Sequence, residues 1–183
     1  MFNATNVSET RPTRLVVGLG NPGERYERTP HNLGFDVVDR LAASLGASAW
    51  QAIQQHKARA EWAVAGAAVL LKPLRLMNLS GTPVQRALKR HAIPVSELVV
   101  VHDDWDVPFG HVVVDCEGCA TAGHLGVASV VGACGDGFSR VRVGVPRGDV
   151  VRRFADNEMA IREGAIELAA ASVIDWLGGR SGA

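Results

Sequence analysis

The stretch LVVGLGNPG at residues 15–23 decides the fold, because a short apolar run ends abruptly in a polar, glycine-containing turn. The stretch LVVVHDD at residues 98–104 has the same character, with an apolar run that stops at Asp103 and Asp104. Strands that are apolar at successive positions are typical of sheets covered by helices on both faces. We therefore predict an α/β fold with a mixed or parallel sheet between layers of helices.

Strand and helix patterns alternate through the rest of the chain. Apolar spacing predicts helices over Asn32–Leu45, Ser80–His91, His124–Val131 and Asn157–Leu177. Further strands are predicted over Val112–Val114 and Arg140–Val145, and a β-hairpin over Trp62–Ala65 and Ala68–Leu71. Asn32 is a candidate N-cap for the first of these helices. We expect a single domain over residues 13–177, with a disordered tail at 1–12 and a frayed end at 178–183.

The composition of the chain limits the classes of function. Lys and Arg together number 19, and so do Asp and Glu, so the formal net charge is zero. A protein that holds a nucleic-acid backbone needs a local excess of cations, which must here be gathered on one face. No apolar run approaches the roughly 18 residues of a membrane span, and no secretory leader is visible. We expect a cytoplasmic protein with reduced cysteines.

Polar side chains stand where the predicted strands end. Asn21 and His31 follow the first strand, Asp103 follows the strand at residues 98–102, and Asn78 precedes a helix. Ligands of open α/β sheets collect at the carboxyl ends of strands, so we expect these side chains to converge. A histidine, a carboxylate and two amides suffice to hydrolyse an ester or amide through an activated water. Taken singly, each residue is equally explained as a turn residue, a helix cap or a strand end.

Taken together, four motifs resemble those of the bacterial peptidyl-tRNA hydrolases. They are LVVGLGNPGERYERTPHNLGF at residues 15–35, LKPLRLMNLSG at 71–81, VVVHDDWDVPFG at 99–110 and RVRVGVPRG at 140–148. Because they occur in the family's order, the resemblance is specific, and it extends from about Leu15 to Phe154. It implies a single three-layer α/β/α domain with a mixed, mostly parallel central sheet.

The resemblance also implies a reaction and a set of site residues. The reaction is hydrolysis of the ester between a peptide and the 3′ end of tRNA, without metal or cofactor. His31 would be the catalytic base, Asp103 its orienting carboxylate, and Asn21 a further active-site residue. The substrate would be contacted by Tyr26, Met77, Asn78, His124 and Leu125. The expected partner is tRNA carrying an acyl or peptidyl group, and we expect a monomer.

The chain departs from the family pattern in the parts that handle substrate. The family's T-R-H-N is Thr29-Pro30-His31-Asn32 here, so one cation beside the base is missing. The family's glycine-rich loop becomes EGCATAGHLG at residues 117–126, which places Leu125 where the family has Asn. Val113 and Asp115 stand where family members often have lysines facing the tRNA, and an anion near phosphates is unfavourable.

Basic residues remain in two other places. The candidate tRNA contacts are Arg86, Lys89, Arg90, Arg140 and Arg142. The alternative is that these cations belong to a helix end and to a solvated strand face.

The cysteines allow a zinc hypothesis. Cys116, Cys119, His124 and Cys134 offer four side chains of the types that bind zinc. The distance of Cys134 along the chain favours unrelated cysteines instead.

Two other functions stay open at this point. The first is an aminoacyl-tRNA-dependent transferase on the same fold, in which the His–Asp pair activates a small amine or hydroxylamine and Leu125 helps to exclude water. The second is a non-catalytic tRNA-binding relic, against which the presence of both His31 and Asp103 argues.

Overall fold

A single sheet forms the centre of the computed structural model, which describes residues 12–55, 57–115 and 123–179. Within these residues seven strands lie in the order β2-β3-β4-β1-β5-β7-β6. Their bounds are Arg14–Gly18 (β1), Gln51–Ile53 (β2), Ala60–Ala65 (β3), Ala68–Pro73 (β4), Leu98–Asp104 (β5), Val112–Asp115 (β6) and Ser139–Gly144 (β7). The helices are α1 (Leu33–Ser44), α2 (Gly81–His91), α3 (Leu125–Cys134) and α4 (Met159–Gly179).

The sheet is mixed, as the sequence predicts. The central strands β4, β1, β5 and β7 run parallel to one another. Antiparallel pairing is confined to the edges, where β2 and β3 continue the sheet from β4, and β6 pairs with β7. The carboxyl ends of the four central strands therefore open on the same edge, where ligands of open α/β sheets bind.

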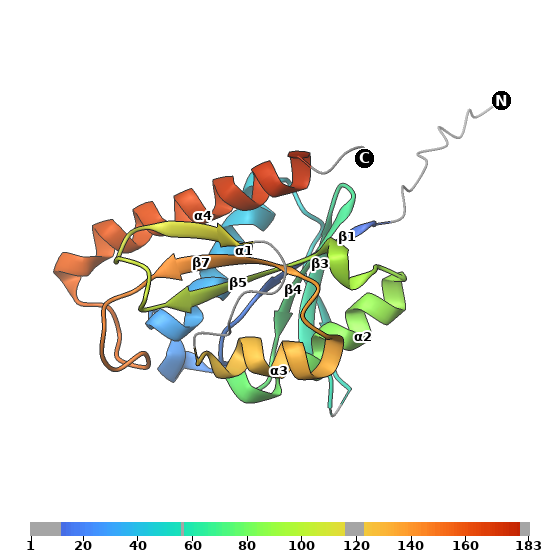
Figure 1. Ribbon diagram of the computed structural model, residues 1–183, viewed down its shortest axis with the longest axis horizontal. Helices are drawn as coiled ribbons and strands as arrows, with labels where there is room; N and C mark the ends of the chain where they lie inside the picture. Colours follow the sequence, from blue (N-terminus) through green and yellow to red (C-terminus); the bar gives the residue numbers. More distant parts are fainter. Residues whose placement is uncertain (1–11, 56, 116–122, 180–183) are drawn as a thin grey trace.

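Helices cover both faces of the sheet (Figure 1), with α1 and α4 on one face and α2 and α3 on the other. Side chains of β1 and β5 alternate between the two cores: Val16 and Val99 pack with α1 and α4, whereas Val17 and Val100 belong to the other core. All four side chains are fully buried. Burial on both faces explains why these strands are apolar at successive positions.

Two glycines bring α1 directly onto the backbone of β1. A Cβ atom on Gly34 would lie 2.4 Å from the backbone nitrogen and oxygen of Leu19, and one on Gly18 would lie 2.1 Å from the carbonyl oxygen of Gly34. Only glycine permits such an approach. The short 3₁₀ helix η2 (Pro30–Asn32), which leads into α1, is thereby held beside the carboxyl end of β1.

Most elements follow the sequence-based boundaries to within a few residues. The edge strand β2 was not predicted, and α4 continues to Gly179, beyond the predicted end at Leu177. Residues 1–11 and 180–183 lie outside the described residues, so the predicted disordered tail and nearly all of the frayed end stay predictions. Among the helices described, none is both long and apolar enough to cross a membrane.

Candidate active site

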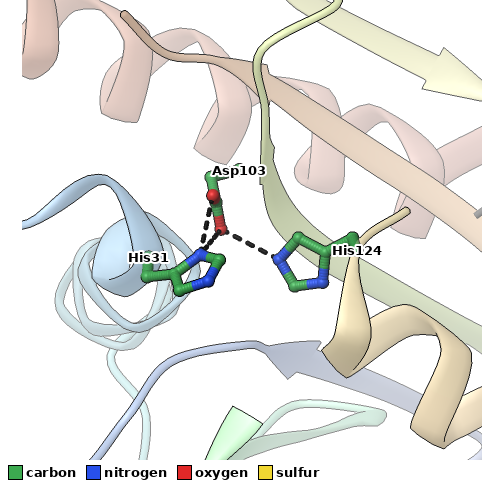
Figure 2. A group of neighbouring side chains, drawn as sticks. All are labelled: His31, Asp103 and His124. Carbon is green, nitrogen blue, oxygen red and sulfur yellow. Dashed lines mark hydrogen bonds and ion pairs between the residues drawn. The ribbon is translucent and has the colours of Figure 1, made fainter. Parts of the chain in front are cut away.

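Three side chains meet at the carboxyl ends of the central strands (Figure 2). His31 comes from η2, Asp103 from β5, and His124 immediately precedes α3. The Nδ1 atom of His31 lies 2.9 Å from Oδ2 and 3.1 Å from Oδ1 of Asp103. The Nε2 atom of His124 lies 3.0 Å from Oδ1 of the same carboxylate. Asp103 and His124 are buried, whereas 19% of the His31 side chain is exposed, so His31 faces the open side of the group.

The N-terminus of α3 fixes the tautomer of His124. Its Nδ1 atom accepts hydrogen bonds from the backbone N–H groups of Gly126 and Val127, at 3.1 and 3.2 Å. A neutral imidazole that accepts at Nδ1 carries its proton at Nε2, so His124 donates to Asp103. The coordinating atoms of His31, Asp103 and His124 lie within 4.8 Å of one another, as in some metal sites. With both His124 nitrogens engaged, the arrangement fits a hydrogen-bonded group better than a set of metal ligands.

Asp103 is ionised in this setting. Burial by itself raises the pKa of a carboxyl group, but the hydrogen bonds from His124 and His31 outweigh it and hold the pKa of Asp103 well below its usual range. An ionised carboxylate only accepts hydrogen bonds, so both imidazoles donate an N–H group to Asp103. His31 therefore carries its proton at Nδ1, and the lone pair of Nε2 is available to take a proton from a reactant.

A third histidine, His102, contacts both Asp103 and His124. His102 lies on β5, buried, and its Nδ1–H donates to the carbonyl oxygen of Asp103 at 2.9 Å. The ring centroids of His102 and His124 are 4.9 Å apart. Burial, and secondarily the nearby His124, lower the pKa of His102 to about 4. His102 is thus uncharged at neutral pH and packs as a neutral ring against His124.

Hydrogen bonds that the sequence did not predict fix the position of Asn21. We call the two bonds between the side chain of Asn32 and the backbone of Asn21 the clasp. Asn32 accepts from the backbone N–H of Asn21 at 2.8 Å and donates to its carbonyl oxygen at 3.1 Å. The side-chain Oδ1 of Asn21 accepts from the backbone N–H of Met77 at 2.8 Å. Asn32 stands at the predicted N-cap position of α1, but its side chain makes no capping hydrogen bond because it is engaged with Asn21.

A pocket of about 190 Å³ opens beside the three side chains. The residues that line it are His31, Asp103, Asp104, Trp105, Gly123, His124, Leu125 and Val150. Four of the predicted site residues are thus brought together. Trp105 and Val150 were not predicted. The position of Trp105, two residues after Asp103, was a usable signal in the sequence, whereas Val150 offered none.

Three predicted substrate contacts do not line this pocket. Tyr26 lies in the 3₁₀ helix η1 (Glu24–Tyr26), with the Arg25 guanidinium 4.7 Å from its ring centroid. Asn78 is exposed on the 3₁₀ helix η3 (Met77–Leu79). Met77 is buried there and takes part through its backbone N–H.

Comparison with known proteins identifies the family of the chain. Residues 15–181 match the family model described as peptidyl-tRNA hydrolase. The chain belongs to the peptidyl-tRNA hydrolase family. It is 46% identical over 157 residues to a peptidyl-tRNA hydrolase of Geobacter sulfurreducens, with 81% of this chain and 80% of the relative covered. It is 39% identical to one of Shouchella clausii, with 90% and 93% covered. The crystal structure of the Acinetobacter baumannii peptidyl-tRNA hydrolase superposes with a TM-score of 0.79, at 29% identity, covering 93% of this chain and 92% of that one.

In this peptidyl-tRNA hydrolase-family chain, the strand β6 carries one carboxylate, Asp115, and no cation. On β6, Asp115 accepts a hydrogen bond from Arg142 at 2.9 Å, and Asp104 accepts one from the same guanidinium at 2.8 Å. Arg142 is therefore matched by two carboxylates. Arg140 is only 1% exposed and pairs with Asp136, so the structure does not favour it as an RNA contact.

The other predicted basic residues share one exposed surface. Arg86, Lys89 and Arg90 lie in the second half of α2 beside a groove of about 370 Å³ that also includes Trp62 of β3. The Arg90 guanidinium lies 5.5 Å from the Trp62 ring centroid. We call Arg86, Lys89, Arg90 and Trp62 the α2 surface. It gathers the local excess of cations that a neutral chain needs in order to bind RNA.

The zinc hypothesis fails on geometry. Cys116 and Cys119 lie outside the described residues, but His124 and Cys134 stand at opposite ends of α3, which has 10 residues. At 1.5 Å per residue such a helix is roughly 15 Å long, so these two side chains cannot bind the same ion. Burial raises the pKa of the Cys134 thiol to about 11, which also disfavours the thiolate that zinc requires.

Proposed function

We propose that this protein hydrolyses the ester that joins a peptidyl, or N-blocked aminoacyl, group to the 3′ end of tRNA. The observation that carries the proposal is the donation of two histidine N–H groups to Asp103, which leaves Nε2 of His31 as a base beside an open pocket. Family membership supports the choice of substrate, since the relatives are named peptidyl-tRNA hydrolases.

His31 acts first as a base and then as an acid. Its Nε2 atom takes a proton from a water molecule while the water oxygen bonds to the carbonyl carbon of the ester. The carbonyl electron pair moves to oxygen and gives a tetrahedral oxyanion. When the bond to the ribose oxygen breaks, the imidazolium returns its proton to that oxygen. The products are a peptide with a free carboxyl group and a tRNA with a free terminal hydroxyl.

Asp103 and Asn21 have supporting roles in this scheme. The buried carboxylate of Asp103 stabilises the imidazolium that forms at His31 and keeps its ring oriented. Because Oδ1 of Asn21 is occupied by the backbone N–H of Met77, its Nδ2 group is the part that can donate to an acyl or ribose oxygen. The clasp by Asn32 fixes that donor in place before the substrate arrives.

The RNA body is held by the α2 surface in this proposal. Its cations are exposed, whereas Arg142 is neutralised by Asp104 and Asp115. A single chain supplies both the pocket and this surface, and the protein is expected to act as a monomer. The comparisons give no support to acyl transfer to an amine or to a non-catalytic role.

The test is loss of the ester from N-acetyl-aminoacyl-tRNA and from free aminoacyl-tRNA, measured with wild type, His31→Ala and His111→Ala. We expect the wild type to cleave only the N-blocked substrate, and His31→Ala to lower the rate by about 10²–10⁴-fold. His111 is exposed and outside the pocket lining, so His111→Ala should match the wild type. Equal cleavage by His31→Ala and wild type would refute the role of the base.

A further inference from the structure

The pocket beside His31 has an apolar wall that the proposed reaction does not by itself require. Trp105, Leu125 and Val150 form this wall, and we refer to them by that name. Trp105 is 45% exposed and Leu125 is 62% exposed. Large apolar side chains that share one exposed hollow often mark a place where an apolar group binds.

Each residue of the apolar wall is fixed relative to the catalytic group. Leu125 follows His124 directly and begins α3, and Trp105 stands two residues after Asp103. The carbonyl oxygen of Val150 accepts a hydrogen bond from the backbone N–H of His31 at 3.1 Å. An ester carbonyl placed next to Nε2 of His31 therefore has its neighbouring substituents within reach of this wall.

We propose that the apolar wall binds the side chain of the ester-bearing amino acid and makes the enzyme selective for aliphatic and aromatic residues there. This inference rests on the proposed function and specifies its substrate class. A volume of about 190 Å³ suits a single amino-acid residue, since pockets that enclose larger ligands measure roughly 300–1,000 Å³. Asp103 also lines the pocket, and its negative charge disfavours an acidic side chain.

Leu125 is the most exposed of the three side chains of the apolar wall, at 62%. A closed apolar pocket discriminates about 10–200-fold for one methylene group. The pocket here is partly open, so we expect about tenfold preference in kcat/KM for N-acetyl-leucyl over N-acetyl-glycyl ester. Leu125→Asn replaces one of the three apolar side chains of the wall by a polar one and should reduce this preference to about threefold or less.

The experiment compares N-acetyl-leucyl, N-acetyl-glycyl and N-acetyl-aspartyl esters on one and the same tRNA. Keeping the tRNA constant separates binding of the acyl side chain from binding of the terminal nucleoside. Wild type, Leu125→Asn and Leu168→Asn are measured; Leu168 is 48% exposed on α4 and supplies a matched loss of a surface leucine. Ratios of kcat/KM within one preparation cancel differences in the active fraction.

The outcomes are distinct. A preference for leucyl that Leu125→Asn reduces and Leu168→Asn retains supports the proposal. Equal cleavage of all three esters by the wild type, or an unchanged preference in Leu125→Asn, overturns it while leaving the hydrolase function intact. Failure of the wild type to cleave any of the three esters overturns the hydrolase function as well.

Discussion

Replacing Asp103 by Asn tests whether the hydrogen-bond directions at the site determine activity. The carboxylate accepts two N–H groups, one from His31 and one from His124. An Asn side chain has one oxygen that accepts and one amide nitrogen that donates. Since α3 locks the proton of His124 on Nε2, the single oxygen must serve His124. The amide nitrogen then faces Nδ1 of His31, which must accept and so moves its own proton to Nε2.

In this variant His31 can no longer act as a base at Nε2, although its ring keeps its position. General-base catalysis contributes about 10²–10⁴-fold, and an unsuitable tautomer in a serine-protease triad costs on the order of 10⁴-fold. We therefore expect Asp103→Asn to lower kcat on N-acetyl-aminoacyl-tRNA by about 10³-fold in single-turnover assays. Asp36→Asn is the matched control, because Asp36 is a carboxylate on α1 that pairs with Arg162, away from the pocket.

A double variant makes the reasoning refutable in a second way. His124→Asn keeps a good N-cap for α3 but removes the N–H group that occupies the acceptor at position 103. In Asp103→Asn/His124→Asn the oxygen at position 103 is free to turn towards His31 and restore its tautomer. We expect the double variant to be about tenfold more active than Asp103→Asn alone, a coupling typical of residues in one network. An Asp103→Asn enzyme within threefold of wild type, or a double variant weaker than the single one, would contradict the assigned tautomers.

Two further predictions concern stability. His102 has a pKa of about 4 in the folded protein, below the ordinary value of 6.5, so between pH 4 and pH 6.5 unfolding is accompanied by protonation of this side chain. The contribution of neutral His102 to the free energy of unfolding is therefore complete above pH 6.5 and is lost as the pH falls towards 4. Between pH 7 and pH 5 the free energy of unfolding in urea should fall by about 2 kcal/mol more for the wild type than for His102→Leu. Equal falls in the two proteins would show that His102 does not cause the loss of stability. Gly34→Ala places a Cβ atom 2.4 Å from the backbone of Leu19, whereas Gly132→Ala on α3 meets nothing within 4 Å. In thermal unfolding we expect Gly34→Ala to be destabilised by at least about 2 kcal/mol and Gly132→Ala to be stabilised by about 0.5–1 kcal/mol. Equal stability of the two variants would disprove the close packing of α1 on β1.

The parts of the fold that the sequence predicts are those with a strong local signal. The strands at residues 14–18 and 98–104 each contain a run of consecutive apolar residues, because both faces of these runs are buried. The edge strand Gln51–Ile53 has three residues and little burial, so no periodicity could reveal it. The alternation of polar and apolar residues at 140–145 predicted a strand with one solvent-exposed face. On that face, however, Arg140 is buried and Arg142 is only partly exposed. Alternation assigns residues to a face, whereas neighbouring elements decide how much of that face meets water.

In the site, too, residues with a local sequence signal could be predicted, whereas contacts that depend on tertiary packing could not. His31 and Asp103 could be predicted because each stands in a motif and at a strand end. The second role of His124, as the cap of α3, depends on where the helix begins relative to β5, and no spacing in the sequence encodes that. The clasp between Asn32 and Asn21 also depends on the approach of α1 to β1 that Gly18 and Gly34 permit.

The charges around the site indicate how substrate binding is divided. Next to the pocket, Asp104 and Asp115 neutralise Arg142, so this guanidinium offers no net attraction to phosphate. The exposed cations of the α2 surface number three, which limits the counterions that RNA binding releases and hence the salt dependence of affinity. Selection of substrate must then depend more on the pocket than on the backbone of the RNA. The apolar wall beside His31 is suited to that task, because apolar contact is insensitive to the screening that weakens surface charges.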